Sequence, residues 1–93
     1  MELKRVVVTG LGALTPVGNT VAETWENLVN GVSGAGPITH FDASKFKTHF
    51  ACEVKNFNGT DYIDRKELRK MDLYTQYAIA AAKEAVEDSG MDL

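Results

Sequence analysis

A long helical segment near the end of the chain constrains the fold more than any other feature. Asp72 can cap its start and Gly90 can end it, so a helix is expected to run to about Ser89. Apolar residues cover most of its circumference, and the narrow polar stripe consists of Gln76, Lys83 and Glu87. Such a helix is typical of a protein interior, but a small domain has too few layers to cover it. The segment therefore predicts that these 93 residues are part of a larger structure.

The first third of the chain predicts a strand, a turn and a helix. Residues 4–9 contain three consecutive valines, which is typical of a strand covered on both faces. Thr20 and Glu23 have the spacing of a capping box, and Gly31 is well placed to end the helix that follows.

The middle of the chain predicts a second strand and a short helix. Residues 31–37 are expected to form a turn-rich loop. Residues 46–55 alternate in polarity, which indicates a strand with one buried face. The residues expected on that face are Phe46, Thr48, Phe50, Cys52 and Val54. Asp64 can cap a short helix over residues 65–70. Together these elements predict an α/β fold.

The glycines that follow the first predicted strand allow two interpretations. Gly10 and Gly12 could bind the pyrophosphate of a dinucleotide, but such a loop leads directly into a helix. Here Thr15 occupies the third glycine position, Pro16 follows it, and the helix starts only after Thr20. We therefore favour a structural turn, with a dinucleotide-binding module, which NAD would stabilise against heat, as the weaker alternative.

Few residues have the chemistry of a catalytic or metal site. Cys52 is the only cysteine, so no internal disulfide can form. Its neighbours Ala51 and Glu53 offer no positive charge to stabilise a thiolate, and we expect an inert strand residue. His40 and His49 lack further ligands at the spacing of a metal site. The residues thus predict no catalytic, cofactor or metal site.

Composition and charge exclude several classes of protein. A net charge of −3 gives no general attraction to nucleic acid. No apolar run approaches the roughly 18 residues that span a membrane. The apolar run after Lys4 and Arg5 is too short for a signal peptide. With a single cysteine, this pattern predicts a cytoplasmic protein.

One charge pattern stands out, the group Arg65, Lys66, Arg69 and Lys70, which we call the basic cluster. With Glu67 it gives residues 65–70 a charge of +3, which leaves −6 for the rest of the chain. Residues four apart share a helix face, so the cluster would attract an anionic partner. A solvated helix face explains the charges equally well. Nucleic acid is a poorer candidate because no aromatic or glycine-rich platform accompanies the cluster.

Motifs along the whole chain resemble the β-ketoacyl-acyl-carrier-protein synthases of the synthase II type. The matching segments are residues 4–19 (KRVVVTGLGALTPVGN), 25–28 (WENL), 31–34 (GVSG), 41–44 (FDAS), 64–72 (DRKELRKMD) and 76–90, which begins QYA and ends SG. The likeness covers all 93 residues in register. Residues 15–18 and 69–72 favour the synthase II branch over the synthase I branch.

The resemblance implies a thiolase-like fold, with five layers in the order αβαβα, of which residues 1–93 would be the N-terminal portion. It implies a dimeric, cytoplasmic acyltransferase that needs no cofactor. Such an enzyme condenses a cysteine-bound acyl group with malonyl-acyl carrier protein and releases carbon dioxide during fatty-acid elongation. The alternative is a non-catalytic, condensing-enzyme-like subunit in which the downstream nucleophile is replaced.

The resemblance also separates catalytic from docking residues. The family's catalytic cysteine and two histidines would lie beyond Leu93, and Cys52 sits where relatives often have glycine. No catalytic residue is therefore assigned in this chain. The residues that dock acyl carrier protein map onto Lys66, Arg69 and Lys70, with Arg65 in support. Alone, the chain is expected to be inactive in condensation and to fold poorly.

Overall fold

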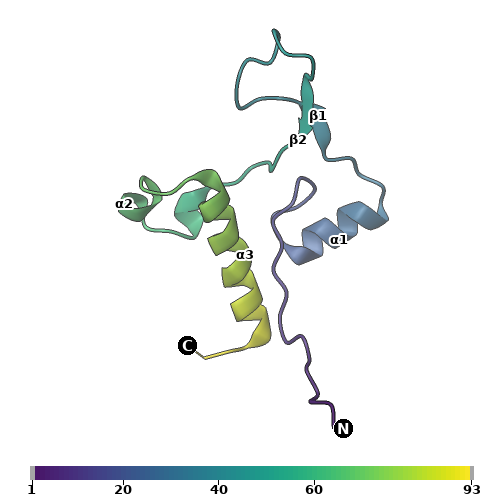
Figure 1. The fold of residues 1–93 in the computed structure, drawn as a ribbon, viewed down its shortest axis with the longest axis vertical. Helices are drawn as coiled ribbons and strands as arrows, with labels where there is room; N and C mark the ends of the chain where they lie inside the picture. Colours follow the sequence, from purple (N-terminus) through teal and green to yellow (C-terminus); the bar gives the residue numbers. More distant parts are fainter. Residues whose placement is uncertain (1, 93) are drawn as a thin grey trace.

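The computed structural model describes residues 2–92, which form helices, a short sheet and long irregular segments. The elements in chain order are helix α1 (Val21–Val29), strands β1 (Ala35–Pro37) and β2 (Phe50–Cys52), the 3-10 helix η1 (Gly59–Asp61), and helices α2 (Arg65–Leu68) and α3 (Leu73–Ser89). Figure 1 shows α3 between α1 and α2, with the β1–β2 hairpin at the top. Met1 and Leu93, the ends of the predicted domain portion, lie outside the described residues.

Helix α1 forms where its capping signals predict it. The Thr20 hydroxyl accepts a hydrogen bond from the Glu23 amide at 3.1 Å. Gly31 follows the helix with a left-handed φ of 70°, which glycine adopts without steric cost. Trp25 and Leu28 are nevertheless 67% and 57% exposed. Local signals therefore form α1, while its apolar face stays uncovered by residues 2–92.

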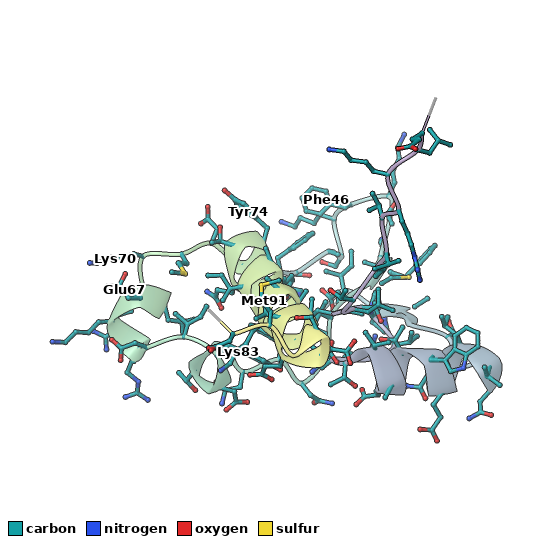
Figure 2. The ribbon with its side chains drawn as sticks, turned by 90° about the horizontal axis from the view of Figure 1, so that it is seen from below. Phe46, Glu67, Lys70, Tyr74, Lys83 and Met91 are labelled. Atoms are coloured by element: carbon teal, nitrogen blue, oxygen red, sulfur yellow. The ribbon has the colours of Figure 1, made fainter. Side chains whose placement is uncertain are left out.

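Helix α3 confirms the prediction of a long helix that ends at Gly90, whose φ is 69°. Asp72 occupies its N-cap position, although its side chain makes no capping hydrogen bond within the described chain. Ala80 is only 4% exposed, whereas Tyr74 is 74% exposed and points away from the rest of the fold (Figure 2). The apolar surface of α3 is thus covered in part.

The predicted strand over residues 4–9 does not form. This stretch runs as a long irregular trace (Figure 1) and pairs with no strand in the part of the chain that the structure describes. Val6 and Val8 are 89% and 79% exposed. A strand needs a neighbouring backbone for its hydrogen bonds, and residues 2–92 supply none here. Residues 4–9 thus have the composition of a buried strand, but no neighbouring strand pairs with them within residues 2–92.

The second predicted strand is shorter than expected and faces the other way. Of residues 46–55 only Phe50–Cys52 form a strand, which pairs antiparallel with β1. Phe50 and Cys52, expected to be buried, are exposed, whereas Ala51 between them is half-buried. The reason is that Ala51 faces a groove that Tyr77 of α3 also lines. The prediction of which strand face is buried was therefore wrong.

Two further boundaries differ from the sequence prediction. Strand β1 lies within residues 31–37, predicted as a loop, and its Gly36 and Pro37 are rare in strands. Helix α2 ends at Leu68, two residues before the predicted end, and the Lys70 amide donates to the Glu67 carbonyl oxygen at 3.0 Å. Such tight turns are common at helix ends.

The described residues spread out rather than close around a core. Their radius of gyration is 16.8 Å, against about 12 Å for a compact domain of this length. Their accessible surface is 7638 Å², against roughly 5,300 Å² for a folded protein of this mass. Ala43 and Ala80 are the buried apolar residues among them. Within residues 2–92, no helix is long and apolar enough to cross a membrane.

Candidate functional site

The N-terminal glycines pack directly against helix α3. A Cβ atom at Gly10 would lie 2.2 Å from the Ala85 carbonyl oxygen, and one at Gly12 would lie 1.8 Å from that of Ala81. A side chain cannot occupy either position unless the backbones separate. The α3 backbone fills the space that a dinucleotide pyrophosphate would need beside these glycines. The geometry therefore supports the structural interpretation of this segment.

Two carboxylates of α3 hold the same segment by its backbone. The Leu11 amide donates to Asp88 Oδ2 at 3.0 Å, and the Ala13 amide donates to Glu84 Oε1 at 2.9 Å. Two extended residues advance about 6.7 Å, close to the rise of about 6 Å over four helical residues, so alternate amides meet carboxylates one turn apart. Glu84 Oε2 also accepts from the Val21 amide, at the first residue of α1, at 3.1 Å. Glu84 thus joins the N-terminal segment, α1 and α3.

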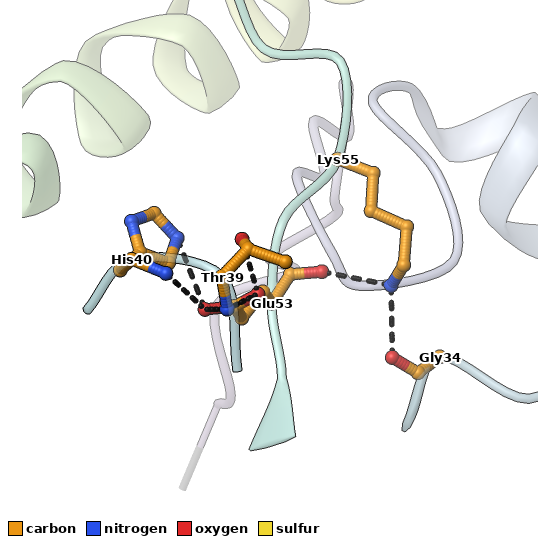
Figure 3. A network of polar contacts seen from close by, with 5 residues as sticks. All are labelled: Gly34, Thr39, His40, Glu53 and Lys55. Atoms are coloured by element: carbon orange, nitrogen blue, oxygen red, sulfur yellow. Dashed lines mark hydrogen bonds and ion pairs between the residues drawn. The ribbon is translucent and has the colours of Figure 1, made fainter. Parts of the chain in front are cut away.

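Lys55 holds three irregular segments together, and Figure 3 shows its contacts with two of them, at Gly34 and Glu53. Its ammonium group donates to the carbonyl oxygens of Pro16, Gly34 and Glu53 at 3.0, 2.8 and 3.0 Å. An ammonium group has three hydrogens, so these acceptors satisfy its donor capacity. Lys55 therefore has a structural role and is not a cation available for a partner.

The Glu53 carboxylate holds the loop that precedes β2 (Figure 3). It accepts from the Thr39 hydroxyl at 2.9 Å and from the Thr39 amide at 3.2 Å, and it lies 3.4 Å from His40 Nε2. Desolvation acts to raise the pKa of Glu53, but the hydrogen bonds from Thr39 and His40 and the nearby imidazole lower that pKa below its ordinary value. The arrangement therefore holds an ionised carboxylate in place.

The basic cluster lies on α2 and in the turn after it, on the side of the molecule opposite α1 (Figure 1). Its members Arg65, Lys66, Arg69 and Lys70 are all exposed. Lys70 Nζ lies 3.9 Å from Glu67 Oε1, and Figure 2 shows both at the outer end of the molecule. An exposed pair of this kind contributes only about 0–1 kcal/mol. The structure brings the predicted docking residues together and leaves their charges accessible.

Three aromatic rings, which we call the aromatic cluster, connect the segment before α2 to α3. The rings of Phe57 and Tyr62 stack, with centroids 5.8 Å apart and planes 5° apart. Tyr77 of α3 meets Phe57 edge to face, with centroids 5.0 Å apart. Lys83, also on α3, places its Nζ atom 6.0 Å from the centroid of the Tyr62 ring. Edge-to-face and offset pairs of this kind stabilise a fold beyond their buried area.

A buried glycine lies where η1, α2 and α3 meet. A Cβ atom at Gly59 would lie 2.5 Å from Leu68 Cδ1 on α2 and 2.7 Å from Gln76 Oε1 on α3. The Gln76 side-chain amide donates to the Met71 carbonyl oxygen at 3.1 Å, in the turn between the two helices. The absence of a side chain at Gly59 therefore lets the side chains of Leu68 and Gln76 both pack against η1.

A groove of about 520 Å³ separates the β1–β2 hairpin from the start of α3. Its walls include Thr39, His40, Glu53, Lys55 and Tyr77. Glu53 and Lys55 already form hydrogen bonds with other parts of the chain, so their charges stabilise the walls of the groove. It contains none of the basic cluster.

The remaining candidates for chemistry stay apart. Cys52 is exposed and has the acidic Glu53 beside it. His49 Nε2 contacts the Phe46 carbonyl oxygen, and His40 pairs with Glu53. Within residues 2–92, no group of three or more acidic, histidine or cysteine side chains is arranged to hold a metal ion.

Sequence reasoning missed the roles of Glu84, Glu53 and Lys55. A signal for Glu84 exists, because it is an acidic residue outside the polar stripe of Gln76, Lys83 and Glu87, and a half-buried carboxylate needs donors. Lys55 and Glu53 carry no such signal, because their partners come from segments up to 39 residues away along the chain.

Comparisons with known proteins identify the family. Residues 3–93 match the model of the β-ketoacyl synthase N-terminal domain. A 3-oxoacyl-[acyl-carrier-protein] synthase 2 from Staphylococcus aureus (strain COL) is 56% identical over 90 residues, which are 97% of this chain and 22% of that protein. A protein of the same name from Vibrio harveyi is 53% identical over 93 residues, which are 100% of this chain and 22% of the relative.

The fold is also shared with a solved ketosynthase structure. The ishigamide ketosynthase/chain length factor superposes with a TM-score of 0.84 and 42% sequence identity, over 92% of this chain and 21% of that chain. The chain thus spans about a fifth of the length of these relatives. The resemblance carried by the sequence motifs is confirmed, and the chain belongs to the β-ketoacyl synthase family, whose N-terminal domain it matches over residues 3–93.

Proposed function

We propose that this chain is the N-terminal part of a 3-oxoacyl-acyl-carrier-protein synthase that acts in fatty-acid elongation. In this reaction, carbon dioxide leaves malonyl-acyl carrier protein as the new carbon–carbon bond forms, and the acyl group is released from the enzyme cysteine. The observation that carries the proposal is the identity of 53–56% to synthases of this name over nearly the whole chain. The complete protein would be a cytoplasmic homodimer that needs no cofactor.

The exposed apolar surfaces support a larger fold around this chain. The valines of residues 4–9, Trp25 on α1 and Tyr74 on α3 all face solvent within residues 2–92. A strand rich in valine and an apolar helix are stable when further layers cover them. In the complete synthase we expect these surfaces to lie between the layers of a five-layer αβαβα arrangement.

Within that synthase, we assign residues 2–92 a role in receiving acyl carrier protein. The support is the basic cluster, whose four exposed cations lie on an otherwise acidic chain. A compact positive patch steers and orients an acidic partner. The residues assigned to docking are Lys66, Arg69 and Lys70, with Arg65 in support.

The chemistry itself belongs to residues outside this chain, so purified residues 1–93 should show no malonyl-dependent chain extension. The reason is that the neighbours of Cys52 in the sequence, Ala51 and Glu53, offer no positive charge to stabilise its thiolate. The measurement is extension with malonyl-acyl carrier protein. Turnover above the blank that disappears in Cys52→Ser would show that the chain carries its own nucleophile.

Charge reversal in the complete synthase tests the docking role. Replacing Lys66, Arg69 and Lys70 together with Glu should lower kcat/KM for carrier-bound substrate by about 5- to 150-fold, because repulsion replaces attraction at three sites. Added salt should narrow the difference between variant and wild type. Decarboxylation or acylation with a small carrier-free substrate should change little. An equal loss on both substrates would mean that the cluster supports the fold and does not dock the carrier protein.

A second candidate is motivated by the solved relative, whose name pairs a ketosynthase with a chain length factor. This candidate is a condensing-enzyme-like subunit that does not itself catalyse the reaction. The residues downstream distinguish the two, because a cysteine followed by two histidines indicates the enzyme. A complete protein that binds carrier protein through the cluster but lacks that cysteine would support the second candidate.

A further inference from the structure

Helix α2, which with the turn after it carries the basic cluster, is too short to be stable by itself. Helix α2 comprises Arg65–Leu68, and the Asp64 side chain at its N-cap makes no capping hydrogen bond within residues 2–92. Isolated helices shorter than about 12 residues are marginal in water, so α2 depends on tertiary contacts. The direction in which the four cations point must therefore be set by residues around the helix.

One of these contacts fixes the start of α2. Tyr62 precedes the N-cap Asp64 by two residues, and its ring stacks on Phe57, which in turn meets Tyr77 of α3. Lys83 of α3 lies over the same ring. The aromatic cluster thus ties the residues directly before α2 to helix α3, which spans 17 residues.

A second contact fixes the end of α2. Leu68 is the half-buried residue of the helix, whereas Arg65, Lys66 and Glu67 are exposed. Its Cδ1 atom lies against the buried Gly59, on the side from which Gln76 of α3 also approaches. Leu68 is therefore the apolar anchor of the last turn, directly before Arg69 and Lys70.

We infer that Tyr62 and Leu68 are positioning residues that orient the basic cluster for its acidic partner. The inference rests on the proposed function, because the partner is the carrier protein assigned there. Neither residue carries a charge, so each acts through the four cations. Attraction at a distance depends on net charge, whereas close pairing depends on where each cation points. Loosening α2 should therefore speed dissociation and leave association nearly unchanged.

The test uses Tyr62→Ala and Leu68→Ala in the complete synthase, with binding of carrier protein followed in real time. Both variants keep every charge. We expect dissociation to become about 3- to 10-fold faster, with association within about twofold of wild type and its salt dependence preserved. KM for carrier-bound substrate should rise in proportion to the dissociation rate, while kcat at saturation should remain unchanged.

Two further variants serve as controls. Tyr62→Phe keeps the stacked ring and should restore wild-type dissociation. Leu28→Ala makes the same substitution at a leucine of α1 that is 57% exposed, and it should leave carrier binding unchanged, because α1 lies on the other side of α3 from α2 (Figure 1). A purely general loss of stability would affect association, dissociation and kcat together.

Slow, wild-type dissociation from Tyr62→Ala would overturn the inference, as would a Tyr62→Phe variant that is as impaired as Tyr62→Ala. Should Tyr62→Ala fail to fold, Tyr62→Leu decides instead, since it keeps apolar volume but loses the stacked ring, and tight binding by it would refute the positioning role. The charge-reversal variant distinguishes a failure of the docking assignment from a failure of the positioning inference. Normal binding after charge reversal refutes the docking surface itself, whereas lost binding there with normal binding in both alanine variants refutes only the inference.

Discussion

Residues 57–90 and residues 2–9 are both rich in apolar side chains, yet only the first region acquires regular structure within residues 2–92. Residues 57–90 combine the aromatic cluster, the buried Gly59 and a helix ended by Gly90. Residues 2–9 leave Val6 at 89% exposure and form no ladder in the described chain. The difference is the distance along the sequence to the partners each region needs.

A helix makes its hydrogen bonds with itself, so local sequence is enough to form it, although not to cover its apolar faces. A strand makes its hydrogen bonds with another segment. In the first region, residues 57–90, the side chains that pack together all lie within the region itself, as Phe57 and Tyr77 do. The second finds only the amide contacts that Glu84 and Asp88 make just after it, at Ala13 and Leu11.

The largest expected effect is seen when residues 1–93 are purified alone. We expect self-association, or a broad unfolding transition, because the apolar surfaces of residues 4–9, α1 and α3 have no cover. Size-exclusion chromatography and thermal unfolding measure this, and hydrogen exchange should find residues 4–9 unprotected. A monomer with one sharp transition and protected amides in residues 4–9 would remove the distinction between the two regions.

The next effect tests the close packing between the N-terminal segment and α3. Gly12→Ala in the complete synthase should lower the free energy of unfolding by about 2–3 kcal/mol, because its methyl group would overlap the Ala81 carbonyl oxygen. Gly36→Ala is the matched control, since no described atom outside its neighbours lies within 4 Å of its added Cβ. Thermal unfolding compares the two. Equal stabilities would mean that the segment does not pack on α3.

A somewhat smaller effect is expected from the carboxylate that joins three segments. Glu84→Ala leaves the amides of Ala13 and Val21 without their acceptor and should cost about 1–3 kcal/mol. Glu87→Ala, on the exposed side of the same helix, should change stability by no more than about 0.5 kcal/mol. Chemical denaturation measures both variants. A difference below the experimental error would show that the hydrogen bonds of Glu84 do not stabilise the fold.

The smallest effect concerns pH. Because the pKa of Glu53 is lowered in the folded chain, its hold on Thr39 and His40 should be fully present above the ordinary glutamate range. That hold should weaken as pH falls through the lowered folded value. The amide resonances of Thr39 and His40 report the change, and Glu53→Gln should abolish it. Identical titration of these amides in Glu53→Gln would assign the effect to another group.

Local signals predicted much of this fold from the sequence. Thr20, Gly31 and Gly90 occupy the cap positions expected of them, because capping depends on a few adjacent residues. The basic cluster was likewise predicted, because its residues are close together in the sequence, on α2 and in the turn that follows it.

What the sequence could not predict depends on distant partners. Residues 4–9 have the composition of a strand but no neighbour within residues 2–92. The buried face of β2 was predicted wrongly. Ala51 is half-buried because it faces a groove that is also lined by Tyr77, which is 26 positions further along the chain. The position of α2 depends on Phe57 and Tyr77, whose rings no periodicity could have paired.

Docking of an acidic carrier protein on the basic cluster is tested most directly by zero-length cross-linking of carrier carboxylates to lysines of the complete synthase. The carrier should cross-link to Lys66 and Lys70, and the yield should fall as salt is raised. Lys45, Lys47 and Lys83 serve as internal controls on the same chain and should remain unmodified. Cross-links at those three lysines, with none at Lys66 or Lys70, would contradict the assignment of the docking surface.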